Sequence, residues 1–314
     1  MSKTLRNPSE EELKELQKNS AAAAIPLHNK KTPTKSPEAN EVKSFFEPAA
    51  TPFKLPSGDL IIAGGAISMR RMTTLEEGLF YDFLRILQSQ ARVDEDGEMN
   101  MDGHLYSSFT KNFLATANAA IDNCIKSNVS VYDLSVLDQV PLFLNLLGIT
   151  YGFEHDFDLQ CPVCSKTSKM NVNIKEIPVK YYDGSIAHPF TFETTSFEFP
   201  VELVIRYLRI SDESVWNDAK ISLSEKYLTL LESASGVLPD GNAITEEHYS
   251  DIITNLNEVD KAKIKDWLNT FSEFGSDLRI TKKFCLNKEC SKYKKPQEVL
   301  LPIENIFQKV FNAL

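Results

Sequence analysis

Two stretches in the first half of the chain carry apolar residues at helical spacing. The first begins at Thr73 and Thr74, each of which stands three residues before a glutamate in a capping-box pattern, and it keeps one apolar face to about residue 90. The second carries its apolar face over residues 113–125. Cys124 falls on that face, so we expect a packed thiol rather than a reactive one.

A third helix is predicted where residues 142–147 are almost entirely apolar. Such a helix is buried on several sides or covered by another subunit. Asp138 and Pro141 suit its first turn, because the missing proline N–H would have no partner there in any case. We expect the helix to end at Gly148.

Alternation with a period of two predicts strands in the second half of the chain. Residues 168–174 alternate polar and apolar positions, and residues 190–207 alternate more strictly. In the second stretch Glu198, Glu202 and Arg206 occupy the face that we expect to be in water. Shorter strands are expected over residues 60–63, 278–284 and 298–303, with a turn at Gly64 and Gly65 after the first of them.

The period becomes helical again between residues 211 and 273, where turn residues separate three apolar stripes. A further short helix is predicted over residues 306–314. The three stripes are Val215, Ala219, Leu223, Tyr227, Leu230 and Leu231; Tyr249, Ile252, Ile253 and Leu256; and Ile264, Trp267, Leu268 and Phe271.

Composition separates a tail from a globular body. Residues 1–52 are rich in proline and polar residues, so we expect a tail that is disordered or becomes ordered on a partner. The chain of 314 residues is 42% hydrophobic, which supports a core. Its net charge of −10 opposes nonspecific attraction to nucleic acid or an anionic membrane and favours protein partners. No apolar run approaches a membrane span, so we expect a soluble cytoplasmic protein.

Four of the five cysteines form two short-spaced pairs that lie far apart, Cys161 with Cys164 and Cys285 with Cys290. Two such pairs suit a tetrahedral zinc ion, because each pair covers one side of the metal. In a reducing compartment the thiols stay available for metal rather than forming disulfides. We therefore predict one structural zinc site. Four thiolates fill the coordination sphere, which argues against a catalytic ion.

Lysines gather around the second cysteine pair, within residues 282–295. They suggest an alternative function, a zinc ribbon that binds nucleic acid. The acidic chain as a whole favours a simpler interpretation, in which they form a solvated surface. The sequence has no nucleophile elbow, no histidine spaced to pair with a serine or cysteine, and no phosphate loop, so we do not expect an enzyme or a small-molecule substrate.

These patterns predict an α+β protein whose mostly helical N-terminal half precedes a zinc-ribbon-like β region with a helical insertion. The expected order is a tail (1–52), a mostly helical domain (53–157), the first half of the ribbon with a β-sheet (158–210), the helical insertion (211–275), and the second half of the ribbon with a C-terminal helix (276–314).

Several short motifs follow one another in a fixed order along the chain. They are Leu-Pro-Ser-Gly at 55–58, Met-Thr-Thr-Leu-Glu-Glu at 72–77, Ile-Asp-Asn-Cys-Ile at 121–125, Leu137-Asp138 before the apolar helix, Tyr151-Gly152, and Cys-Pro-Val-Cys at 161–164. This ordered series resembles the T4-like phage baseplate hub subunit and hub-assembly protein family. The resemblance implies a non-enzymatic structural or assembly protein, whose partners are other baseplate hub proteins. It further implies that the protein acts in the cytoplasm of the infected bacterial host and contributes to the tail baseplate of the virion.

Overall fold

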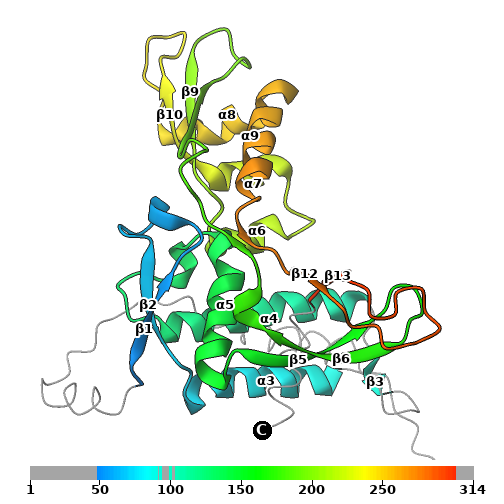
Figure 1. Cartoon of the computed structure of the whole chain (residues 1–314). Helices are drawn as coiled ribbons and strands as arrows, with labels where there is room; N and C mark the ends of the chain where they lie inside the picture. The colour runs from blue at the N-terminus through cyan, green and yellow to red at the C-terminus, as the bar shows by residue number, and fades with distance from the viewer. Residues whose placement is uncertain (1–47, 91, 94–98, 101–102, 302–314) are drawn as a thin grey trace, which may run out of the picture. The chain divides into compact units, whose positions relative to one another are not determined.

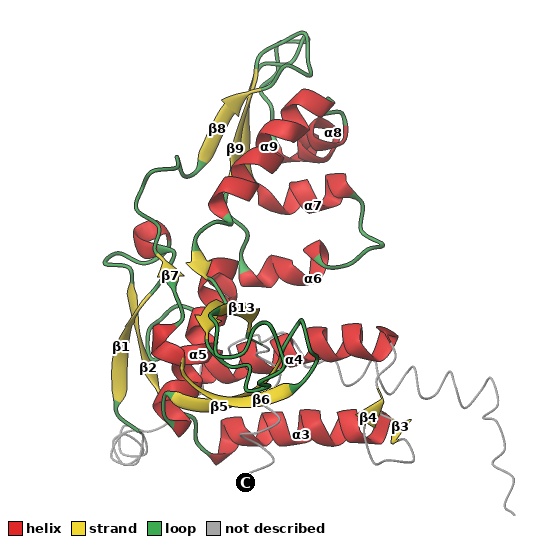
Figure 2. Ribbon diagram, turned by 45° about the vertical axis from the view of Figure 1, so that its right-hand side comes forward, coloured by secondary structure: helices red, strands yellow, loops and turns green. Residues whose placement is uncertain are grey.

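The computed structural model describes residues 48–90, 92–93, 99–100 and 103–301 (Figure 1). The predicted tail up to residue 47 and the predicted helix over residues 306–314 lie outside this part of the chain. Helices and short strands both occur along it, which confirms the α+β class (Figure 2). The α-helices are α3 (Thr74–Gln90), α4 (Gly103–Cys124), α5 (Val136–Tyr151), α6 (Glu213–Trp216), α7 (Leu223–Leu230), α8 (Tyr249–Thr254) and α9 (Glu258–Phe271).

The strands of the described residues form two-stranded antiparallel sheets, except that β8, β9 and β10 form a three-stranded antiparallel sheet. The strands are β1 (Ala50–Lys54), β2 (Ala66–Arg70), β3 (Arg92–Val93), β4 (Met99–Asn100), β5 (Glu154–Gln160), β6 (Thr167–Asn173), β7 (Val179–Lys180), β8 (Phe190–Glu193), β9 (Val201–Ile205), β10 (Leu231–Gly236), β11 (Gly275–Ser276), β12 (Arg279–Lys282) and β13 (Gln297–Leu300). Short 3₁₀ helices are η1 (Gly58–Leu60), η2 (Val131–Asp133), η3 (Ile174–Glu176), η4 (Ile210–Asp212) and η5 (Glu246–His248).

The N-terminus of α3 confirms the predicted capping box. The N–H and the hydroxyl of Thr73 both donate to Glu76 Oε2 at 2.8 Å. The buried Glu76 carboxylate also accepts two hydrogen bonds from the Arg70 guanidinium, which donates in turn to the Asn123 carbonyl in α4. Burial raises the pKa of Glu76, but the hydrogen bonds from Arg70 and Thr73 lower it to about 2. This ion pair therefore joins β2 to both helices.

Helix α5 starts before and ends after the limits that the sequence predicts. Ser135 caps its start by accepting a hydrogen bond from the Leu137 N–H at 3.2 Å. Gly152 ends it, with a φ of 96° and an N–H that donates to the Gly148 carbonyl. The prediction that Gly148 ends the helix is wrong. Gly148 lies within α5, where a Cβ would stand 2.2 Å from the Phe153 ring, so the glycine leaves room for that ring.

Pro141 also lies inside α5 rather than in its first turn. It has no N–H to offer the Leu137 carbonyl four residues earlier, so that oxygen lacks its helical partner. Gly275 of β11 approaches the same carbonyl, and a Cβ at this glycine would lie 3.1 Å from the oxygen. The φ of 96° at Gly275 also favours glycine. The start of α5 and β11 therefore pack closely.

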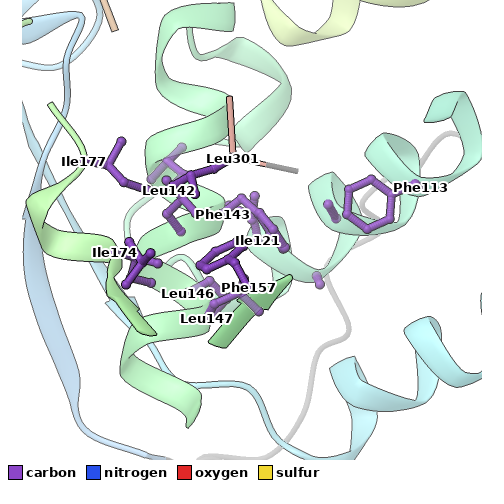
Figure 3. Packing of buried hydrophobic residues seen from close by; sticks show 14 of the residues in the cluster. Phe113, Ile121, Leu142, Phe143, Leu146, Leu147, Phe157, Ile174, Ile177 and Leu301 are labelled. Carbon is purple, nitrogen blue, oxygen red and sulfur yellow. The ribbon is translucent and has the colours of Figure 1, made fainter. Parts of the chain in front are cut away.

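One hydrophobic core lies between α4, α5 and the β5–β6 hairpin (Figure 3). Strand β5 alternates buried and exposed positions along its length and directs Phe157 and Leu159 inward. Residues from the end of the described chain complete this core, among them Phe284 and Leu301. The core therefore needs segments that are more than a hundred positions apart in the sequence.

A second core lies between the β8–β9–β10 sheet and helices α7, α8 and α9, which Figures 1 and 2 show together. The inward residues of β9 are fully buried. Trp267 of α9 stacks on Phe190 and on Phe271, with ring centroids 5.5 Å apart in both pairs. The helices predicted around residues 249–256 and 264–271 are confirmed as α8 and α9.

The strand pattern predicted over residues 190–207 is confirmed in part, as two strands, β8 and β9, which form a hairpin. The connection between them is fastened to the start of α9 by the buried Asp260 carboxylate. Asp260 accepts hydrogen bonds from the Thr195 N–H at 2.7 Å and from the Ser196 hydroxyl at 2.6 Å. These contacts stabilise a turn at residues where the alternation of apolar and polar residues alone predicts a strand.

Arg206 does not lie on a wet face as predicted. Its guanidinium makes a bidentate ion pair with Asp212, at 2.7 and 3.1 Å, and both side chains are largely buried. The pair fixes the exit of β9 to η4, which a period-two pattern does not reveal.

Three further segments show where the predicted elements hold and where they do not. The strand expected over residues 60–63 is absent: the 3₁₀ helix η1 ends there and turns lead on to the tight turn at Gly64 and Gly65, whose positive φ values confirm that turn. Leu231, expected to end the first helical stripe, is instead the first residue of edge strand β10. The predicted strands over residues 168–174, 278–284 and 298–303 are present in part or whole as β6, β12 and β13.

Candidate metal centre

The first cysteine pair lies in the tight turn between β5 and β6. The Cys161 N–H donates to the Lys166 carbonyl at 3.0 Å, and the Cys161 carbonyl accepts from the Ser165 N–H at 2.8 Å. Ser165 adopts a left-handed φ of 55°, which closes the turn. Cys161 is buried and Cys164 is half-buried, so one edge of the pair remains near solvent.

The second cysteine pair lies in the longer connection between β12 and β13. The Lys294 N–H donates to the Cys285 carbonyl at 3.0 Å, and the Cys290 N–H donates to the Asn287 carbonyl at 3.0 Å. The Lys292 N–H points at Cys290 Sγ, 3.4 Å away. A backbone N–H in this position stabilises a thiolate, because it places positive charge against the sulfur.

The four sulfur atoms meet in one place and lie within 4.8 Å of one another. Cys161 Sγ is 3.9 Å from Cys290 Sγ, and Cys164 Sγ is 3.8 Å from Cys285 Sγ. A tetrahedral ion with metal–sulfur bonds of about 2.3 Å separates its sulfur ligands by about 3.8 Å. The spacing thus fits one four-coordinate metal ion, and each pair of close sulfurs takes one atom from each loop.

Backbone amides favour ionisation at the first pair. The Lys166 N–H lowers the pKa of Cys164 to about 6. Burial raises the pKa of Cys161, but the N–H groups of Val163 and Cys164 outweigh it, so the net direction is downward. At the second pair burial raises the pKa of Cys285 to about 12. Four adjacent thiolates repel one another, so ionisation of all four requires a cation among them.

Comparison with known protein families matches residues 105–301 to the family described as T4 bacteriophage base plate protein. The matched segment covers more than half of the chain and contains both cysteine pairs. The chain belongs to this family. The resemblance to T4-like baseplate proteins is therefore confirmed, and this is a structural protein of a phage baseplate. No curated protein sequence and no solved structure matches the chain.

In this baseplate protein a buried glutamine, which the sequence analysis did not single out, contacts the cysteine cluster. Gln297 Oε1 lies 3.6 Å from Cys161 Sγ, and its Nε2 is buried without a hydrogen-bond partner. A 180° flip of the side-chain amide exchanges its oxygen and nitrogen and places an N–H against the sulfur. A thiolate can then accept a hydrogen bond from this N–H. A glutamine at the first position of β13 carries no sequence signal for such a contact, since only the fold brings it to Cys161.

Two histidines that the sequence places near the first pair lie elsewhere in the baseplate protein. His155 Nε2 is 2.9 Å from the Gly152 carbonyl. His188 lies against the Tyr207 ring, with centroids 4.9 Å apart. Cys124 is fully buried in the first core, as predicted, and burial raises its pKa to about 12. Among the described residues, the group that could hold a metal ion consists of the four paired cysteines.

The described helices of the baseplate protein include none with the length and apolar character that crossing a membrane requires.

Proposed function

We propose that Cys161, Cys164, Cys285 and Cys290 bind one structural zinc ion, and we name this four-cysteine site the cysteine clasp. Zinc accepts four thiolates in a tetrahedron without geometric strain, which suits the sulfur spacing. Four thiolates leave no position for a substrate or an activated water. The clasp would therefore contribute stability rather than catalysis, by linking the β5–β6 and β12–β13 hairpins.

In this proposal the clasp completes a zinc-ribbon-like region from two distant halves. The first half belongs to residues 158–210, and the second begins at residue 276. Residues 211–275 form the insertion between them, which contributes α7, α8 and α9 to the second core. The ion would hold both ends of this insertion next to the first core, because Cys161, Cys285 and Cys290 all belong to that core.

For the protein as a whole, the proposed function is a non-enzymatic one: a hub subunit of a contractile phage tail baseplate, or an assembly factor of that hub, which acts by binding other hub proteins. The observation that carries this function is the family match over residues 105–301. The matched segment holds most of the first core and the clasp, so the family relationship includes the part that zinc would make rigid. Its place would be the cytoplasm of the infected host during assembly, and then the virion.

Co-expression with each of the hub proteins of the same phage, followed by size-exclusion chromatography with light scattering, tests the hub role. We expect co-elution at a fixed stoichiometry with at least one hub protein. A folded, zinc-loaded protein that elutes alone in the presence of every hub protein would contradict the proposal. Elemental analysis should return about one zinc per chain.

Nucleic-acid binding through residues 282–295 gains no support from the family match. Titration of single- and double-stranded DNA and of RNA against salt separates it from the hub role, because phosphate contacts lose affinity steeply as salt rises.

A further inference from the structure

A shallow groove of about 470 Å³ runs between the two loops that carry the cysteines. Residues 166–168 line one side, directly after the first cysteine pair, and residues 286–289 line the other, within the second pair. Both walls are therefore next to proposed ligands of the clasp. A bound metal ion would hold them at a constant separation, so the groove would have a fixed shape.

Each cysteine loop exposes one branched apolar side chain. Leu286 on the wall of the groove is 62% exposed, and Val163 on the other loop is 54% exposed. Both residues directly adjoin a cysteine of the cluster in sequence, and backbone hydrogen bonds close both loops. An exposed apolar side chain contributes favourable free energy when a partner covers it.

Two exposed lysines without a carboxylate partner, Lys166 and Lys288, line the same groove, and other such lysines lie in the second cysteine loop. Over residues 282–295 six lysines face a single glutamate, Glu289, although the chain as a whole carries a net charge of −10. Lys282 makes an ion pair with Glu176 at 2.8 Å and is thereby neutralised. Within the described part of the chain, no such ion pair forms at Lys166, Lys283, Lys288, Lys292, Lys294 or Lys295, all of which are exposed.

We propose that this groove binds a short acidic segment of a partner protein that carries apolar residues among its carboxylates. The lysines would attract and orient the carboxylates, and Leu286 would receive an apolar side chain. The inference rests on the proposed function, since it identifies how a baseplate partner is recognised. It assigns the lysines around the second cysteine pair to protein recognition rather than to a solvated surface.

The composition of the groove favours an acidic polypeptide over nucleic acid. Proteins that bind single-stranded nucleic acid stack the bases on several aromatic rings. This loop has two aromatic residues. Phe284 is buried, and the Lys294 ammonium lies 5.4 Å from the centre of the Tyr293 ring. A long polyanion would also extend beyond the groove onto a chain of net negative charge, whereas a short segment would not.

Fluorescence anisotropy of the full-length, zinc-loaded protein tests the proposal with a labelled octapeptide, Glu-Asp-Leu-Glu-Asp-Leu-Glu-Glu. A second peptide has serine in place of both leucines and the same charge. The groove variant is Lys166→Glu/Lys288→Glu. The matched control, Lys220→Glu/Lys265→Glu, reverses the same number of exposed lysines on other parts of the chain. Zinc content and melting temperature establish that each variant is folded.

We expect the groove variant to bind the leucine peptide at least about tenfold more weakly than the control variant does. We expect Leu286→Ser to weaken the leucine peptide about fivefold and to leave the serine peptide unchanged. Equal losses in the groove and control variants, or equal binding of the two peptides, would overturn the proposal. Tighter binding of an eight-nucleotide single strand than of the leucine peptide would overturn it as well.

These results are separable from the hub role. The protein could bind the peptide through Lys166, Lys288 and Leu286 and yet co-elute with no hub protein. That result would support the groove as a peptide-binding site and contradict a hub protein as its partner. Co-elution that survives the groove variant unchanged would retain the hub role and reject the groove as the contact.

Discussion

Asp138 carries a buried carboxyl group whose ionisation opposes folding. It lies in the first turn of α5 and is fully buried. Its Oδ1 accepts a hydrogen bond from the Ser57 N–H at 2.8 Å, but its Oδ2 has no partner. The Ser57 hydroxyl lies beside the carboxyl without a well-formed hydrogen bond. Burial raises the pKa of Asp138 to about 6, although the Ser57 and Ser135 N–H groups partly oppose this shift.

The sign and size of the effect on stability follow from this pKa. The carboxyl binds its proton more tightly in the native state than in the unfolded chain, where the pKa is 3.8. Its contribution to the free energy of unfolding is therefore greatest below pH 3.8 and is lost as the pH rises through about 6. At about 1.4 kcal/mol per pH unit, the complete loss is about 3 kcal/mol.

Replacing Asp138 by asparagine removes the charge and keeps the size. The asparagine side chain does not ionise, and its amide can still accept from the Ser57 N–H and donate to the Ser57 hydroxyl. We expect Asp138→Asn to raise the free energy of unfolding relative to wild type, with an advantage about 1.4 kcal/mol larger at about pH 7.5 than at about pH 5. Acid also affects metal binding, but it does so equally in the variant and the wild type. This effect therefore cancels when the free energy of unfolding of the wild type is subtracted from that of Asp138→Asn at each pH.

Urea denaturation followed by circular dichroism at a series of pH values measures this difference. Asp133→Asn is the control, because it removes an exposed carboxylate from the adjacent 3₁₀ helix; we expect a change within about 0.5 kcal/mol at each pH. A stability difference for Asp138→Asn that is constant across the pH range would refute the raised pKa. The nearby Tyr207 is also titratable, and burial raises its pKa above this range.

Other predictions concern the clasp and the close packing of α5. Cys164→Ser, or treatment of the wild type with a strong chelator, should remove zinc and lower the melting temperature together; an unchanged melting temperature after complete metal loss would contradict a structural role. Gln297→Leu should weaken zinc affinity about tenfold in a chelator competition, and equal affinity would show that its contact with Cys161 is incidental. Gly148→Ala should destabilise the protein by about 1–3 kcal/mol, because the new methyl group meets the Phe153 ring at 2.2 Å. Gly78→Ala in α3 has open space within 4 Å and should be neutral or stabilising by up to about 1 kcal/mol, so equal effects of the two changes would contradict the packing argument.

Local signals in the sequence predicted the elements whose causes are local. The capping box at Thr73 determines where α3 starts, since the residues that make its hydrogen bonds are adjacent in the chain. The spacing of each cysteine pair likewise predicted the two loops, because a loop of this length bends around one ion. That both pairs converge was inferred from the chemistry of zinc, and the sulfur distances fit it.

Sequence pattern failed where a distant contact decides the outcome. The break between β8 and β9 depends on Asp260, which lies 65 residues after Thr195. Gly148 lies within α5 rather than at its end, and the position holds a glycine because the Phe153 ring packs where a side chain would otherwise stand. Gln297 reaches Cys161 across 136 residues, and no periodicity marks it. Each of these depends on tertiary packing, which overrides local preference.

The separation of the two cysteine pairs also has a consequence for synthesis on the ribosome. Cys161 and Cys290 are 129 residues apart, so at bacterial elongation rates the first pair waits on the order of ten seconds before the second emerges. During that interval the nascent chain presents two of the four cysteines, while Phe284 and Leu301 of the first core have not yet been made. If the clasp binds zinc as proposed, metal loading and completion of that core would be late, nearly simultaneous steps, and the cell's supply of zinc would matter at the end of translation rather than at its start.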